Sequence, residues 1–187
     1  MTITDIPVDN GINLPALLDA RVALDDDPSL AQFVWRATCR WENGTHSYST
    51  IEKFSGLGGE QSHCAEFGYD VDHPECFASQ DRGPTPVEFV LVGLAGCLTA
   101  GIASVAQMRN IQLRSVTATL EADMDLTGVL GVDPTVRNGF GSVAVHYQID
   151  ADAAPEDIEA LVAQSQKRSA VYDVIANPTN IVVYVNR

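Results

Sequence analysis

Cys97 is the residue of this chain with the clearest chemical potential, and it lies in a charge-free run over residues 89–106. Gly93 and Gly96 precede it, each costing a helix about 1 kcal/mol relative to alanine, so we expect them to allow close approach of another backbone or a ligand. Cys97 is therefore either a small buried residue in a tightly packed helix or a reactive thiolate beside a space. Cys97 lies 12 residues after Thr85, where the helix is predicted to begin, so a thiolate would need a cation brought in by the fold.

A second cluster has the residue types of a zinc site. His63, Cys64, His73 and Cys76 fall within 14 residues. Adjacent histidine and cysteine rarely bind one metal together, and only the pair at positions 73 and 76 has chelating spacing, so a zinc-stabilised module ranks last among the hypotheses. We expect no metal and, because no phosphate-binding or dinucleotide motif occurs, no cofactor.

The composition indicates a folded protein that does not bind nucleic acid. The chain has 187 residues, 45% apolar and 19% charged, which favours one folded domain over residues 1–187. A net charge of −14 argues against nucleic acid as a partner, since a polyanion needs clustered lysine and arginine. Residues 1–30 are predicted to be an acidic, solvated lead-in to a core over residues 31–187. The acids of this lead-in are Asp5, Asp9, Asp19, Asp25, Asp26 and Asp27, against Arg21 alone.

The sequence favours a soluble, cytoplasmic protein. Its start, MTITDIPVDN, has neither a basic nor an apolar leader region, and four cysteines in such a chain are predicted to be free thiols. Residues 89–106 reach the lower length limit for a membrane span but are rich in small residues. We expect a helix buried inside a soluble protein and no membrane partner.

The first half of the chain predicts a hairpin. Residues 14–24 suggest a short helix, and residues 33–41 alternate with period two, placing Cys39 with Trp35 and Trp41 on one core face. Asn43-Gly44 predicts a tight turn into a returning strand over residues 45–54. Residues 55–84 are predicted to be irregular, with a possible short strand over residues 67–71.

The second half predicts two helices around a strand pair. Thr85, Pro86 and Glu88 form a capping box that opens a helix running to about residue 110, with Glu88 and Cys97 on opposite sides of it. Residues 116–126 and 143–149 alternate as strands, a helix begins at Pro155, and Ser169 caps a short helix to residue 175. Residues 181–185, apolar on both faces, predict a central strand. The order is α+β.

The segment GPTPVEFVLVGLAGC, from Gly83 to Cys97, resembles the OsmC/Ohr family of osmotically inducible and organic-hydroperoxide-resistance proteins. That family has a GP-x-P-x-E entry followed by an alanine- and glycine-rich helix with a reactive cysteine. The sequences RNGF at 137–140 and RSAVYD at 168–173 extend the resemblance. It covers residues 80–187 well and the hairpin from Phe33 more loosely.

The resemblance implies an OsmC-like α+β fold, with antiparallel sheets wrapped around central helices in an intertwined homodimer whose reactive sites lie at the subunit interface. It implies that Cys97 attacks the O–O bond of an organic hydroperoxide, with Glu88 assisting. Family peroxidases resolve the sulfenic acid with a second cysteine, and Ser169 stands at that position here. Their activating arginine has no counterpart at residues 43–45, which leaves Arg40 and Arg36 as nearby candidates.

Two functions of different classes remain open. The first is thiol-dependent reduction of hydroperoxides through Cys97, with the sulfenic acid resolved by Cys64, Cys76 or an external thiol. The second is a non-catalytic protein that keeps the fold and binds an apolar small molecule. Consumption of hydroperoxide by the reduced protein would separate them. Among the cysteines we expect Cys97 to be the most reactive, because Cys39 is predicted to be shielded and the other two lie among acidic residues.

Overall fold

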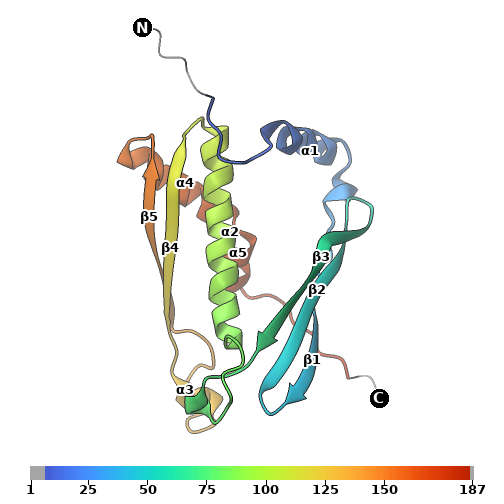
Figure 1. Cartoon of the computed structure of the whole chain (residues 1–187), viewed down its shortest axis with the longest axis vertical. Helices are drawn as coiled ribbons and strands as arrows, with labels where there is room; N and C mark the ends of the chain where they lie inside the picture. The colour runs from blue at the N-terminus through green and yellow to red at the C-terminus, as the bar shows by residue number, and fades with distance from the viewer. Residues whose placement is uncertain (1–6, 186–187) are drawn as a thin grey trace. The chain divides into compact units, whose positions relative to one another are not determined.

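The computed structural model describes residues 7–185, whose helices and antiparallel strands confirm the α+β class (Figure 1). Contacts divide the chain into two compact units, one over residues 13–90 and the other over residues 91–187 with residues 1–12. A single domain over residues 1–187 stays a prediction.

The first unit, residues 13–90, contains a three-stranded sheet in the order β1–β2–β3 (Figure 1). Its strands are β1 (Thr38–Asn43), β2 (His46–Gly56) and β3 (Gly59–Val71). The hairpin predicted at Asn43-Gly44 is confirmed, but its two turn residues are Gly44, at a φ of 58°, and Thr45, because Asn43 pairs with His46. The prediction of an irregular segment over residues 55–84 is wrong for β3. Leu57 and Gly58 both adopt positive φ, 52° and 78°, and so turn β2 directly into β3.

The beginning of the first predicted strand differs from the structure. Residues 33–37 lie outside β1 and join the sheet through one bridge between Val34 and Ser55. Cys39 lies opposite Ser49 in the β1–β2 ladder and is exposed, as are Trp35 and Trp41. The prediction that these three side chains form core is wrong, because within this unit nothing covers that part of the sheet.

A buried carboxylate ties the end of β3 to the segment that follows. Asp72 is 1% exposed, and its Oδ1 accepts hydrogen bonds from the hydroxyls of Thr45 and Ser79, each at 2.6 Å. The backbone N–H groups of His73 and Arg82 donate to the same carboxylate. These donors, first the hydroxyls of Ser79 and Thr45, hold the pKa of Asp72 far below its usual range.

The predicted short helix near the amino terminus is confirmed as α1 (Leu14–Asp26), which belongs to the same unit and is followed by the 3₁₀ turn η1 (Pro28–Ala31). Asn13 caps α1 by accepting a hydrogen bond from the N–H of Ala16 at 3.1 Å. None of the helix residues is buried within the chain.

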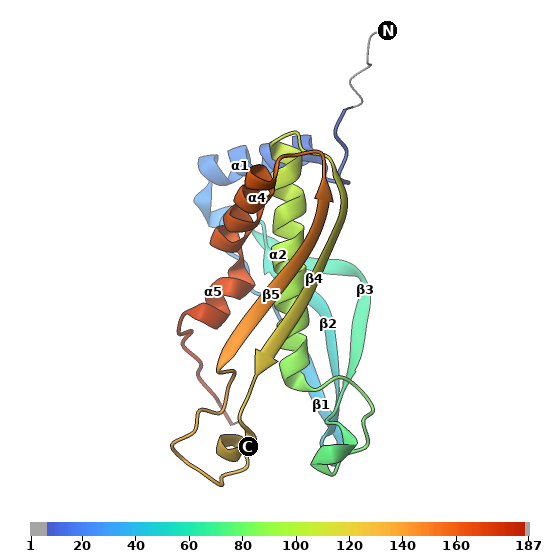
Figure 2. The same ribbon diagram turned by 90° about the vertical axis from the view of Figure 1, so that its left-hand side faces the viewer.

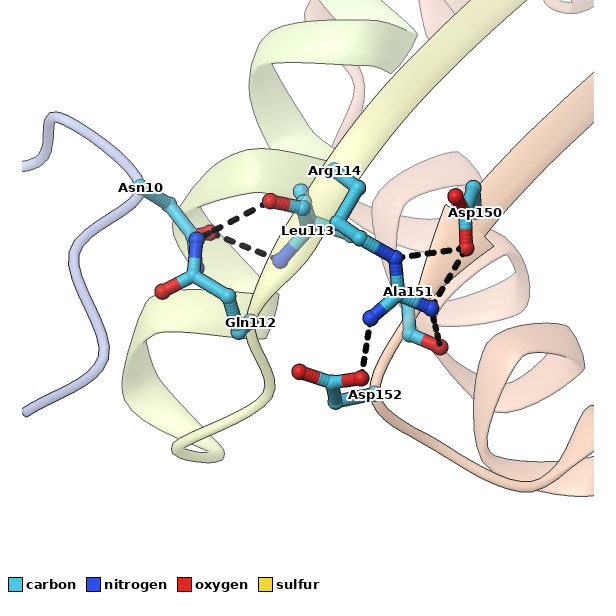
Figure 3. Close-up of polar contacts among 7 residues, drawn as sticks. All are labelled: Asn10, Gln112, Leu113, Arg114, Asp150, Ala151 and Asp152. Atoms are coloured by element: carbon cyan, nitrogen blue, oxygen red, sulfur yellow. Dashed lines mark hydrogen bonds and ion pairs between the residues drawn. The ribbon is translucent and has the colours of Figure 1, made fainter. Parts of the chain in front are cut away.

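The lead-in before α1 is held more firmly than predicted. The side-chain oxygen of Asn10 accepts hydrogen bonds from the N–H of Leu113 at 2.9 Å and from the amide of Gln112 at 3.1 Å (Figure 3). Gln107 adds two more bonds, to the N–H of Asn10 and the carbonyl of Val8. Residues 8–10 are therefore docked rather than solvated, while the predicted contribution of Asp5 lies outside the described residues.

The second unit is built on α2 (Pro86–Met108), which begins in the first unit and continues past residue 91. The strands β4 (Leu113–Asp123) and β5 (Ser142–Ala151) pair in an antiparallel hairpin alongside α2 (Figure 2). Their alternating burial confirms the predicted strands. The connection between them contains the short helix α3 (Leu126–Val129).

The last two helices follow α2 back toward its beginning (Figure 2). They are α4 (Pro155–Arg168) and α5 (Ala170–Ala176), as predicted. On α4, Leu161 packs in a buried cluster with Val105 and Ala106, and the Ser165 hydroxyl donates to the carbonyl of Leu98 at 2.6 Å. This chain of contacts fixes where α5 begins.

Two apolar segments of this unit are less buried than predicted. Only 28% of the most apolar window of α2 is buried, although the helix is long and apolar enough to cross a membrane by length and composition. Residues 181–185 form no strand, contrary to the prediction, and Ile181 and Tyr184 are 81% and 82% exposed. A central strand that is apolar on both faces must pack against other elements on both sides. Residues 181–185 have no such packing within the described part of this unit, so they form no strand.

Candidate functional site

The site is centred on the sulfur of Cys97, midway along α2. The hydroxyl of Ser169, which is 5% exposed, donates a hydrogen bond to Cys97 Sγ at 3.1 Å. Ser169 is the N-cap of α5, and its Oγ accepts a hydrogen bond from the N–H of Tyr172 at 3.1 Å. The Ser169 hydroxyl thus donates its one proton to the sulfur while its oxygen accepts from the helix backbone.

Backbone groups complete the surroundings of the sulfur. Two backbone N–H groups at the start of α5, those of Val171 and Ala170, also act on the pKa of the thiol. Burial raises the pKa of the Cys97 thiol, but the Ser169 hydroxyl and these two N–H groups lower it, and the net result is a pKa below the ordinary value. Neutral donors therefore shift the Cys97 thiol toward the thiolate relative to an ordinary cysteine.

The groups that act on the sulfur within its unit are neutral, and the expected contribution of a cation stays a prediction. The start of α2 is too far from Cys97 to act on it, but the start of α5 lies against the sulfur. The sequence showed that Ser169 caps a helix. It did not show that Ser169 contacts Cys97, because the two residues are 72 positions apart.

The glycines near Cys97 have a different role from the predicted one. A Cβ atom on Gly93 would make ordinary contact with Val171 Cγ1 at 3.9 Å, and one on Gly96 would meet nothing within 4 Å. The glycine that permits close approach is Gly101, where a Cβ would collide with the Ser165 hydroxyl of α4. Gly96, itself exposed, leaves open space beside Cys97.

Glu88 is placed by its helix cap. Its Oε2 accepts a hydrogen bond from the N–H of Thr85 at 2.8 Å, as the capping box predicts. The Thr85 hydroxyl instead pairs with His73 Nδ1 at 2.8 Å. Glu88 belongs to the first unit and Cys97 to the second, so a role for Glu88 at the sulfur stays a prediction.

The two candidate arginines are both engaged with carboxylates in the first unit. Arg36 forms a two-pronged ion pair with Glu60, at 3.1 and 3.2 Å, and also donates to Ser55. Arg40 pairs with Glu42 at 2.7 Å. An activating role for either arginine stays a prediction.

The remaining cysteines are free and exposed, and all three belong to the first unit. Cys64 lies in β3 and Cys76 in the 3₁₀ turn η2 (Glu75–Phe77). The hydroxyls of Ser47 and Ser49 lower the pKa of the Cys39 thiol, so Cys39 is the chief competitor of Cys97 for oxidants. Among residues 7–185, no three histidine, cysteine or acidic side chains are grouped to hold a metal ion.

A comparison with models of known protein families shows which family this chain belongs to. The profile of the OsmC-like protein family matches residues 79–183, more than half of the chain. The chain belongs to the OsmC-like family. This family consists of soluble proteins, which fits α2 as a helix of a soluble fold. None of the curated proteins matches the chain.

Solved structures agree on the fold. An OsmC-like protein from Mycoplasma pneumoniae has a TM-score of 0.58 and 16% identity, with 76% of this chain and 86% of that chain covered. An organic hydroperoxide resistance protein OsmC from Legionella pneumophila, described as a predicted redox protein, has a TM-score of 0.54 and 22% identity, with 78% and 90% covered. At these identities the likeness establishes the OsmC-like fold alone.

Proposed function

We propose that this OsmC-like chain reduces organic hydroperoxides with Cys97 as the attacking thiolate. The observation that carries the proposal is the hydrogen bond of 3.1 Å from the Ser169 hydroxyl to Cys97 Sγ, beside the N–H groups of Ala170 and Val171, which also lower the pKa of the thiol. They favour the thiolate, which is the nucleophilic form of cysteine. The Legionella pneumophila relative, named for organic hydroperoxide resistance, supports the same class of substrate.

The chemistry is a displacement at oxygen. The Cys97 thiolate attacks one peroxide oxygen, the O–O bond breaks, and the departing alkoxide takes a proton to become an alcohol. Cys97 is left as a sulfenic acid, oxidised by two electrons. The neighbours of Cys97 in α2 include the buried Leu94 and Leu98, an apolar surrounding that supports an organic substrate.

Single-turnover consumption of cumene hydroperoxide by the reduced protein tests the proposal. The native protein should consume one equivalent rapidly, and Cys97→Ser should abolish the reaction. Cys39→Ser is the matched control, since Cys39 is the other thiol with a lowered pKa. Loss of activity in Cys39→Ser but not in Cys97→Ser would contradict the assignment, and no consumption by the native protein would favour a small-molecule-binding role.

We also propose a homodimer that works in the cytoplasm. The exposed apolar side of α2, with Val92 67% exposed, and the exposed residues 181–185 support a second copy as the covering partner. Four free cysteines suit a reducing compartment.

A further inference from the structure

We propose that a polar cavity in the first unit binds a primary ammonium group, that of a small free amine or of a lysine side chain. The cavity has a volume of about 90 Å³ and lies between the β1–β2 turn and the segment after η2. The residues that line it include Thr45, His46, Asp72 and Ser79, all within residues 13–90. The proposal does not depend on the chemistry proposed for Cys97.

Two hydroxyl groups of the cavity wall offer oxygen lone pairs, because their protons are engaged elsewhere. The hydroxyls of Thr45 and Ser79 both donate to Asp72 Oδ1, each at 2.6 Å. A hydroxyl group has one proton to donate, and its oxygen can still accept hydrogen bonds. Thr45 Oγ1 and Ser79 Oγ also contact each other, so the two acceptor oxygens are adjacent.

His46 adds a nitrogen acceptor to the same cavity. Its Nε2 lies 2.8 Å from Asp70 Oδ1, and because an ionised carboxylate can only accept, this nitrogen carries the ring proton. In the neutral ring Nδ1 is then an acceptor. Nδ1 is buried and has no hydrogen-bond partner among residues 7–185. A buried polar atom without a partner is unfavourable, so this nitrogen points to an occupant that donates.

The fixed charge beside the cavity is negative. Asp72 is 1% exposed, and the hydroxyls of Ser79 and Thr45, with smaller help from backbone N–H groups, hold its pKa far below the usual range, so it is ionised. Its donors are neutral, and within the described part of the chain it forms no ion pair. A buried charge is usually paired, so a cationic occupant is favoured.

These groups together fit an ammonium better than a metal ion or water. A primary ammonium has three N–H donors and no acceptor, which complements two hydroxyl oxygens and one ring nitrogen. Calcium and magnesium ions take oxygen ligands, so the nitrogen of His46 does not suit them. The cavity is also larger than a single water molecule needs. Gly44 and Gln80, which line it and are exposed, leave an opening for the rest of a longer amine.

Nitrogen NMR of the histidine side chains tests the proposal in the native protein. Before any addition, Nε2 of His46 should carry the ring proton and Nδ1 should carry none. Methylammonium chloride should then shift the Nδ1 signal in a saturable way. Equal concentrations of potassium chloride, or of tetramethylammonium chloride, which has no N–H donor, should not. A saturable shift with Nα-acetyl-lysine amide as well would assign a lysine side chain, and a shift with methylammonium alone would assign a small free amine.

Two variants each remove one of the acceptors. His46→Leu and Ser79→Ala should weaken methylammonium binding at least about tenfold, followed at the backbone N–H signal of Gly44, because hydrogen bonds from charged donors are the stronger kind. His63→Leu is the matched control, since this histidine of β3 lies outside the cavity, next to two phenylalanine rings, and should bind as the native protein does. One variant that keeps the native amide spectrum beyond the cavity suffices for the test.

Several results would overturn the proposal. A proton on Nδ1 of His46 would remove the acceptor on which it rests. Equal shifts with potassium or tetramethylammonium would show a site for charge alone, and no saturable shift with either amine would leave the cavity to water. Native affinity in the folded His46→Leu or Ser79→Ala variants would place the amine elsewhere. None of these results would bear on peroxide reduction at Cys97.

Discussion

The pKa of the Cys97 thiol is lowered by the Ser169 hydroxyl, which donates to the sulfur at 3.1 Å, and by the backbone of Ala170 and Val171 rather than by a charged group. The contribution of Ser169 is directional, because its oxygen already accepts from Tyr172 N–H and its proton goes to the sulfur. Neutral donors preserve the apolar character of the site, which an arginine would not. The same serine also begins α5, so its loss affects both reactivity and stability.

Replacing Ser169 with alanine should raise the pKa of the Cys97 thiol. A hydrogen bond to a charged acceptor contributes about 1.5 kcal/mol, so the midpoint of the alkylation rate of Cys97 against pH should rise by about one unit. Loss of the cap should also lower the free energy of unfolding by about 1 kcal/mol. Asn13→Ala is the control, since Asn13 caps α1 in the other unit and its loss should change stability alone. An unchanged alkylation profile in Ser169→Ala would contradict the assignment.

Asp72 should make the folded state sensitive to acid. Its pKa is lowered by the hydroxyls of Ser79 and Thr45, so the folded state binds fewer protons there than the unfolded state. The resulting stability is fully present above the unfolded pKa of about 4 and is lost as the pH falls toward the lower folded value. Asp72→Asn should therefore be less stable than the native protein near neutral pH and lose less stability on acidification, as measured by denaturant unfolding. An equal loss of unfolding free energy on acidification in both proteins would contradict the assignment of this acid sensitivity to Asp72.

At the scale of elements, the site depends on how closely α4 approaches α2. Gly101 lets the Ser165 hydroxyl reach the helix surface, and Leu161 packs against Val105 and Ala106 further along. Because Ser169 is the single residue between the end of α4 and the start of α5, this contact sets the position of Ser169 relative to Cys97. The packing of two helices therefore controls the hydrogen bonds at the sulfur.

Two glycine-to-alanine changes in α2 should have opposite effects on stability. At Gly101 the added methyl group would collide with Ser165, and such overpacking should cost about 1–3 kcal/mol of unfolding free energy. At Gly96 the methyl group would enter open space, and the higher helix propensity of alanine should stabilise the protein by up to about 1 kcal/mol. Chemical denaturation of both variants checks the pair. A stabilised Gly101→Ala would show that α4 moves away at no cost.

At the scale of the whole molecule, the chain leaves more apolar surface uncovered than an isolated protein of its size would be expected to show. The uncovered residues occur in both units, and they include Trp35, Trp41, Val92 and the segment 181–185. Water contact with such surface is unfavourable, so a second copy of the chain is the expected cover.

Sedimentation equilibrium should therefore give a mass of twice the 20.1 kDa of the chain. Val92→Glu should shift the protein toward monomer, because a charge on the exposed apolar side of α2 would have to be buried in the interface. Val132→Glu is the matched control, since Val132 is 72% exposed in the connection between β4 and β5. A native monomer at micromolar concentration, or equal effects of the two variants, would contradict the homodimer.

The sequence by itself determined the features that depend on neighbours along the chain. The hairpin at Asn43-Gly44, the capping box at Thr85 and Glu88, and the start of α5 at Ser169 all involve residues within a few positions of one another. Periodicity likewise predicted α4 and the β4–β5 hairpin, because each buries one face against the same unit. Of β3, only the end over residues 67–71 was predicted as a possible strand, since its turn places Leu57, which rarely adopts positive φ, in the left-handed region.

Only the tertiary structure decided which groups surround Cys97. Its hydroxyl partner is 72 residues away, and no local pattern records a contact of that range. The same holds for Cys39, where alternation predicted burial but the sheet leaves that face open within its unit. A side chain's pKa and reactivity depend on the donors and the solvent around it. Those surroundings arise when α4 docks on α2 and brings the first turn of α5 to the sulfur.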